Sequence, residues 1–100
     1  MNAALCVGIY SQGKALEVAA IASGRPSVTA SFPATGMGIE AIRVFLLSSQ
    51  GNSVRLAVAG AAALSVALAL GSESDGDVFI VSPSVACHSV ALAKYAGRAI

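Results

Sequence analysis

The order of apolar and polar positions along the chain predicts strands first, and then helices that alternate with strands. Residues 4–9 read ALCVGI, a continuous apolar run typical of a strand buried on both faces. Residues 15–22 form a second short run, and in residues 27–32 every second position is apolar, as in a half-buried strand. Turn-forming segments with glycine or proline separate these runs, so we expect three antiparallel strands. The second run also has good helix propensity, which leaves a helix as the alternative there.

The remaining segments alternate between helix and strand patterns. Thr35 is placed to cap a first helix, whose polar face carries Glu40 and Arg43 three residues apart. The apolar face of this helix consists of Ile39, Ile42, Phe45 and Leu46. We then predict a strand at 54–59, a helix at 61–70, a strand at 77–82, and a last helix from Pro83 to Gly97. The apolar positions of the last helix are Val85, Cys87, Val90, Ala91 and Tyr95.

This succession, β-β-β-α-β-α-β-α, predicts one α/β domain over residues 1–100. Antiparallel strands followed by strands with helical crossovers imply a five-stranded mixed sheet flanked by helices. In this topology residues 27–32 lie at the edge of the sheet. An exposed edge strand is a template for pairing with another chain, so we expect self-association there.

Composition narrows the range of partners. Hydrophobic residues make up 56% of the chain and charged residues 11%, with a net charge of +1 and a mean hydropathy of +0.79. The basic residues are spread along the chain, so nucleic acid is expected to bind weakly if at all. Low net charge favours a protein partner or self-association. Cys6 and Cys87 lie in apolar contexts, which indicates buried thiols in a reducing, cytoplasmic compartment, with a disulfide as the alternative.

Residues 54–71, VRLAVAGAAALSVALALG, approach the length of about 18 apolar residues that suggests a membrane span. Arg55, Gly60 and Ser65 interrupt this segment, and it divides naturally into the strand and the helix predicted above. We therefore expect no membrane association.

Four segments resemble a known family. Residues 7–10 (VGIY) and 16–19 (LEVA) resemble the opening VGID…LDVA of DEDD-type insertion-sequence transposases, whose N-terminal domain is similar to Holliday-junction resolvases. Residues 32–46, 54–59 and 78–83 resemble that family's FPNT…G…L…WL, VxVALE and VxVVNP segments, in the same order. The resemblance covers roughly residues 5–96 and implies a ribonuclease H-like fold, which has the element order predicted above.

In that family four carboxylates hold two Mg²⁺ ions, which stabilise the attacking and leaving oxygens of phosphodiester cleavage. The resemblance puts Tyr10 at the first carboxylate position and Ala59 at the second, and the others follow the last helix, where residues 97–100 read GRAI. A phenol and a methyl group do not supply the carboxylate oxygens that Mg²⁺ prefers. The resemblance therefore implies a catalytically inactive interaction module without metal or cofactor. Its degenerate pocket is expected at Tyr10, Ser11, Gln12, Lys14 and Ala59.

Other motifs leave alternatives open. A GxxxxGK pattern from Gly8 to Lys14 suggests a nucleotide-binding domain, but Ala15 stands where a hydroxyl is needed, and a helix must follow to direct N–H groups at phosphate. His88, the only histidine, would serve Cys–His chemistry only if Cys6 came near it. The acids outside the expected positions are Glu17 on the second strand, Glu40 on a helix, and Glu73, Asp75 and Asp77 in a loop suited at most to weak cation binding.

Overall fold

The chain forms strands β1 (Ala4–Gln12), β2 (Ala15–Ala22) and β3 (Val28–Pro33), followed by alternating helices and strands. These are α1 (Gly36–Leu47), β4 (Ser53–Gly60), α2 (Ala63–Leu70), β5 (Val78–Ile80) and α3 (Ser89–Arg98). A computed structural model describes residues 4–22, 28–47, 53–71, 78–84 and 88–98. The element order is the predicted one, and residues 15–22 are a strand rather than a helix.

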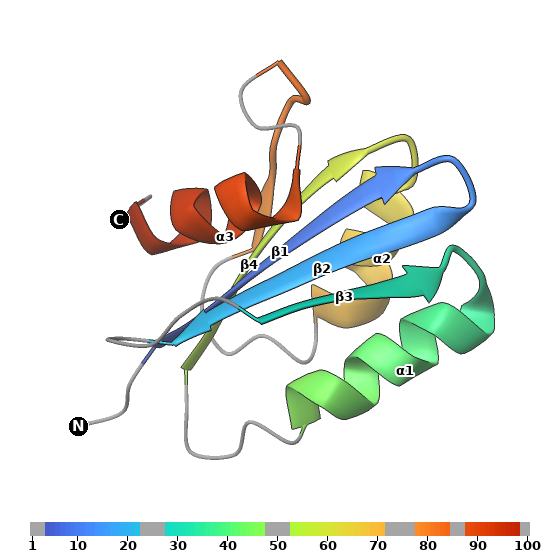
Figure 1. Cartoon of the computed structure of the whole chain (residues 1–100), viewed down its shortest axis with the longest axis horizontal. Helices are drawn as coiled ribbons and strands as arrows, with labels where there is room; N and C mark the ends of the chain where they lie inside the picture. Colours follow the sequence, from blue (N-terminus) through green and yellow to red (C-terminus); the bar gives the residue numbers. More distant parts are fainter. Residues whose placement is uncertain (1–3, 23–27, 48–52, 72–77, 85–87, 99–100) are drawn as a thin grey trace.

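The strands form one mixed sheet in the order β3-β2-β1-β4-β5 (Figure 1). β1 pairs antiparallel with β2 and β2 antiparallel with β3, whereas β4 runs parallel to β1 and β5 parallel to β4. β1 is the central strand: Val7 and Ile9, 0% and 1% exposed, pack on the α1 side of the sheet, and Cys6 and Tyr10 are partly buried on the α3 side. The continuous apolar run at the start of the chain is thus explained by burial on both faces, and the expected mixed α/β sheet is confirmed.

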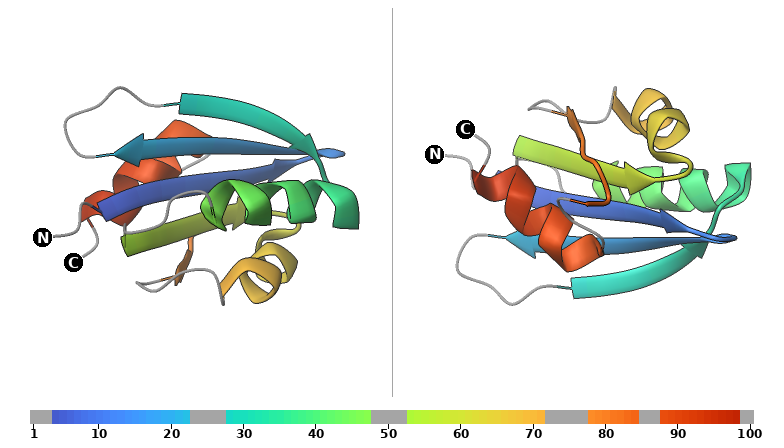
Figure 2. Two further views of the ribbon diagram at one scale, coloured as in Figure 1. Left: turned by 90° about the horizontal axis from the view of Figure 1, so that it is seen from below. Right: turned by 90° about the horizontal axis from the view of Figure 1, so that it is seen from above.

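Different helices cover the two faces of the sheet. In Figure 2, α1 lies in front of the sheet when the molecule is seen from below, and α3 lies in front when it is seen from above. The core on the α1 side contains large side chains, among them Ile9, Leu16, Ile42, Leu56 and Leu70. The core on the α3 side contains Ala57, Ala59, Val81, Leu92 and Ala96. These smaller side chains allow α3 to lie close to the sheet.

β1 and β2 form a tight hairpin. Gln12 pairs with Ala15, so Gly13 and Lys14 are the two loop residues. Gly13 has φ 60°, and no non-glycine residue of the described chain has a positive φ. A positive φ at the first loop position alone is the pattern of a type II′ turn, whose twist matches that of the strands. The predicted turn at this position is therefore confirmed.

The start and polar face of α1 agree with the sequence analysis. Thr35 caps the helix, because its hydroxyl Oγ1 accepts the backbone N–H of Gly38 at 3.3 Å. Arg43 forms an ion pair with Glu40 on the polar face, and its Nη2 also donates to the backbone oxygen of Ala69 in α2 at 2.8 Å. The pair therefore links the two helices as well as facing solvent.

The apolar segment over residues 54–71 contains two elements, β4 and α2, as predicted. Gly60 separates them with φ 102°, and a Cβ atom at this position would lie 2.2 Å from the backbone oxygen of Ser11. A side chain is excluded here both by the backbone conformation and by the close approach. No helix in the described ranges is long and apolar enough to cross a membrane.

The last helix begins later than expected. Pro83 lies in a turn rather than in the first helical turn, and α3 starts at Ser89 and continues through Arg98, past the predicted end at Gly97. Ser82 stabilises the turn, since its hydroxyl accepts the backbone N–H of Ser84 at 3.3 Å. The buried apolar residues of α3 are Leu92, Ala93 and Ala96, whereas Val90, Ala91 and Tyr95 are partly exposed. Val85 and Cys87 lie outside the described residues.

Two strands also differ from expectation. β5 is limited to three residues, Val78–Ile80, within the predicted range of 77–82. β3 is more exposed than a half-buried strand, because only Phe32 is partly buried. The reason is its edge position, where one side has no neighbouring strand within the described chain. Residues 23–27, 48–52 and 72–77, which include Glu73, Asp75 and Asp77, lie outside the described residues.

Candidate functional site

One row of residues crosses the sheet on the face covered by α3. Tyr10 of β1 pairs with Ala59 of β4 on one side and with Glu17 of β2 on the other. Glu17 in turn pairs with Ser31 of β3. Directly paired residues project from the same face of a sheet, so this row runs Ala59, Tyr10, Glu17, Ser31 and ends at the free edge.

The two positions at which the resemblance implies carboxylates are adjacent but packed with apolar groups. Ala59 is 1% exposed and belongs to the core beneath α3, against which Tyr10 is partly buried. This part of the row therefore holds no oxygen-rich site, because the only polar group of the pair is the phenol of Tyr10.

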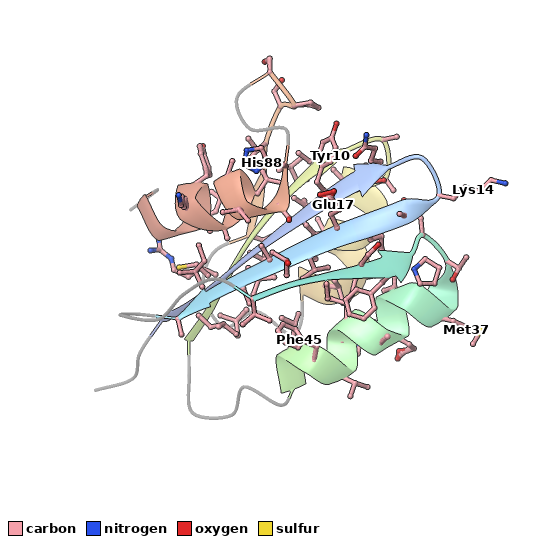
Figure 3. The ribbon with its side chains drawn as sticks, viewed as in Figure 1. Tyr10, Lys14, Glu17, Met37, Phe45 and His88 are labelled. Carbon is pink, nitrogen blue, oxygen red and sulfur yellow. The ribbon has the colours of Figure 1, made fainter. Side chains whose placement is uncertain are left out.

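The other three residues of the expected pocket lie outside this row. Ser11 faces the α1 side, where its hydroxyl accepts the backbone N–H of Ala62 at 3.2 Å and so fixes the turn before α2. Gln12 and Lys14 are exposed at the hairpin end. Figure 3 shows Lys14 directed away from Tyr10 and Glu17. The structure thus brings Tyr10 and Ala59 together, turns Ser11 to the opposite face and leaves Lys14 in the hairpin loop, whereas Gln12 projects from the same face as Tyr10, two positions further along β1.

Lys14 is also followed by β2 instead of a helix. The GxxxxGK pattern therefore lies in a β-hairpin, and no helix N-terminus directs its N–H groups toward a phosphate. This geometry removes the structural basis of the nucleotide-binding alternative.

An open cleft of about 490 Å³ lies beside the row, between β3 and the start of α3. We call it the α3 cleft, and it is lined by Glu17, Thr29, Ala30, Ser31, His88, Ser89 and Val90. Figure 3 shows Glu17 and Tyr10 side by side on the sheet, with His88 at the adjacent end of α3. The volume is within the range of small-ligand pockets, and the lining combines a carboxylate, an imidazole and hydroxyl groups.

His88 caps α3. Its Nδ1 accepts the backbone N–H of Ala91 at 3.2 Å, and its carbonyl oxygen accepts the N–H of Leu92 at 3.1 Å. Because Nδ1 acts as an acceptor, the ring proton of the neutral imidazole is on Nε2. His88 is exposed and lines the cleft.

Gly8 allows α3 to approach the sheet at this end. A Cβ atom on Gly8 would lie 2.2 Å from the backbone oxygen of Ser89 and 2.4 Å from the backbone nitrogen of Ala93. A glycine within a strand is a recognised signal of close backbone approach. Gly8 was expected only as part of a phosphate-loop pattern, but its lack of a side chain is what brings His88 and Ser89 next to β2 and β3.

The α3 cleft is suited to binding a polar or cationic group. Among the described residues no group of three or more His, Cys, Asp or Glu side chains is arranged to hold a metal. Cys6 does not join His88, because its Sγ lies near Gly97, nine positions further along the chain and about 13 Å along the helix from His88. The carboxylate of Glu17 and the surrounding hydroxyls are hydrogen-bond acceptors that fit an ammonium or guanidinium group.

Comparison of the chain with protein-family models and with curated proteins finds no match.

Proposed function

We propose that this chain is a ribonuclease H-like domain that binds an extended segment of a partner protein along β3 and does not cleave phosphodiesters. The fold assignment is supported by the strand order β3-β2-β1-β4-β5, with antiparallel pairing on one side of β1 and parallel pairing on the other. The lack of activity is supported by Tyr10 and Ala59 at the two adjacent strand positions where the resembled family has carboxylates.

The observation that carries the binding proposal is the exposure of β3. Five of its six residues are exposed, and Phe32 is partly buried. Within the described chain no strand pairs with the outer side of β3. Backbone N–H and C=O groups on that side are free to form a ladder with an added strand. Strand addition of this kind derives affinity from main-chain hydrogen bonds and specificity from alternate side chains.

β3 is a better acceptor for a partner than the opposite edge of the sheet. β5 has three residues and β3 has six residues, so β5 offers fewer backbone groups for a hydrogen-bonded ladder. Apolar side chains of β3 also line a shallow hollow against α1, formed by Val18, Val28, Ala30, Phe32 and Phe45. An added strand therefore finds both backbone partners and an apolar surface at β3.

The test is a titration of ¹⁵N-labelled protein with nine-residue peptides of alternating apolar and polar sequence, followed by ¹H–¹⁵N NMR. We expect the amide signals of residues 28–32 to shift most, and hydrogen exchange to slow at alternate residues among them, because every second N–H of an edge strand faces outward and gains an acceptor from the added strand. Shifts confined to α2 or β5, or no shifts at millimolar peptide, would contradict strand addition at β3.

A further inference from the structure

We propose that the α3 cleft is a subsite for a basic side chain carried by the segment that pairs with β3. The inference rests on the proposed function and adds a prediction about the sequence of the partner segment. This segment should carry a lysine or arginine on the α3 side of the sheet, with apolar neighbours on the α1 side. It follows from the register of the sheet, the charge of the cleft and the character of the opposite face.

Register brings the partner's side chain within reach of Glu17. The partner residue opposite Ser31 projects from the same face as Glu17, two strand spacings away, or about 9–10 Å between backbones. A lysine or arginine side chain spans most of this distance, and the carboxylate of Glu17 covers the rest. Ser31 lies between the two groups, and its short side chain leaves the path open.

The charge of the cleft favours a cation. Glu17 is the only carboxylate among the lining residues, and it forms no salt bridge with another described residue. The N-terminus of α3 contributes roughly half a positive charge, which is smaller than the full negative charge of Glu17. Hydroxyl groups of Thr29, Ser31 and Ser89 add acceptors for the remaining N–H groups of a guanidinium.

The α1 side of the sheet determines which residues should flank the basic residue in the partner segment. Successive residues of an added strand point to opposite faces, so the positions next to the basic residue face the α1 side. There they meet the apolar hollow lined by Val28, Ala30 and Phe32. The preferred segment therefore reads apolar, basic, apolar at the centre of the pairing.

A second copy of this chain fits the site less well. The β3 segment, VTASFP, contains neither lysine nor arginine. Pairing of two β3 strands would satisfy the backbone but leave Glu17 of both copies without a cation. A basic segment of a different protein fits both requirements.

The experiment compares two nine-residue peptides with valine at alternate positions and one central arginine or citrulline, which has the same shape without the charge. We expect the wild-type domain to bind the arginine peptide roughly tenfold or more tightly, as a charge-assisted hydrogen bond predicts, with shifts at Glu17, Ser31 and Ser89. In Glu17→Gln both peptides should bind equally, whereas Glu40→Gln, on an exposed face of α1, should keep the preference.

A second variant keeps the test independent of that substitution. Ser31→Lys puts an ammonium group beside Glu17 within the chain, so the arginine and citrulline peptides should bind this variant with equal affinity, both more weakly than the wild type because a lysine also disfavours pairing at an edge strand. Equal binding of both peptides to the wild type, with shifts along β3, would overturn the subsite while strand addition stands. If neither peptide binds, strand addition itself fails. N-acetylarginine amide binding as tightly as the arginine peptide would assign the cleft to a free small cation and overturn the strand-borne source.

Discussion

Tyr10 and Glu17 are direct partners across β1 and β2, on the face of the sheet that α3 covers. A carboxylate therefore lies one strand away from the position at which the resembled family binds metal, at the side of the sheet nearer to the free edge. This displacement changes the chemistry available. A single carboxylate beside hydroxyl groups binds a cation, whereas two-metal cleavage needs several carboxylates that converge on one point.

The first prediction concerns catalysis. The wild-type domain should leave nicked and branched DNA uncut in Mg²⁺ or Mn²⁺, as followed on denaturing gels. Cleavage by the wild type that disappears on addition of EDTA would contradict the proposed function.

The double variant Tyr10→Asp, Ala59→Glu should lower the free energy of unfolding by at least about 2 kcal/mol, because position 59 is 1% exposed and a carboxylate there is buried in an apolar core.

The second prediction concerns the contact between β1 and α3. Gly8→Ala should lower the free energy of unfolding by about 1–3 kcal/mol in urea titrations, since its Cβ would collide with the backbone of Ser89. Gly36→Ala is the matched control, because nothing lies within 4 Å of the Cβ that it would add. Equal unfolding midpoints for the two variants would argue against close packing of α3.

The third prediction concerns the helix cap. His88→Ala should cost on the order of 1 kcal/mol of stability, because the N–H of Ala91 loses its acceptor. His88→Asn should restore most of this loss, since an asparagine side chain also caps helices. Thermal denaturation of the three proteins measures the difference, and a stable alanine variant would show that the cap contributes little.

The fourth prediction concerns self-association. At high concentration the wild-type chain should form weak dimers through β3, because no described strand pairs with the outer side of this edge. Ala30→Lys puts a charge on the exposed edge strand and should shift the chain toward monomer in sedimentation equilibrium, whereas Ala41→Lys on the exposed side of α1 should not. Dimers that persist in Ala30→Lys would locate the contact elsewhere.

Local patterns were sufficient for most of the fold. The turn at Gly13, the cap at Thr35 and the pairing of Glu40 with Arg43 depend on neighbours within a few residues, and the sequence predicted all three. The start of α3 was missed, because the preference of proline for a first helical turn is weak beside the turn that Ser82 stabilises and the cap that His88 provides.

The α3 cleft was not predicted, since its walls come from residues far apart in the chain. Glu17 and His88 line one cavity only because α3 packs across β1 at Gly8. Nothing in the immediate sequence around Glu17 indicates that a helix lies above it. The degenerate pocket was expected from consecutive residues, but alternate side chains of a strand point to opposite faces, and this divides Tyr10 from Ser11.

The two-residue loop at Gly13 also has a consequence for how the chain folds. It joins β1 and β2 locally, whereas the parallel pairing of β1 with β4 must wait for a chain segment of about fifty residues to close, for example between Tyr10 and Ala59. The hairpin is therefore expected to form first and to serve as the template onto which β4 docks. In pulsed hydrogen exchange during refolding, amides of β1 and β2 that face each other should be protected before those of β4, and simultaneous protection would indicate that the whole sheet condenses in one step.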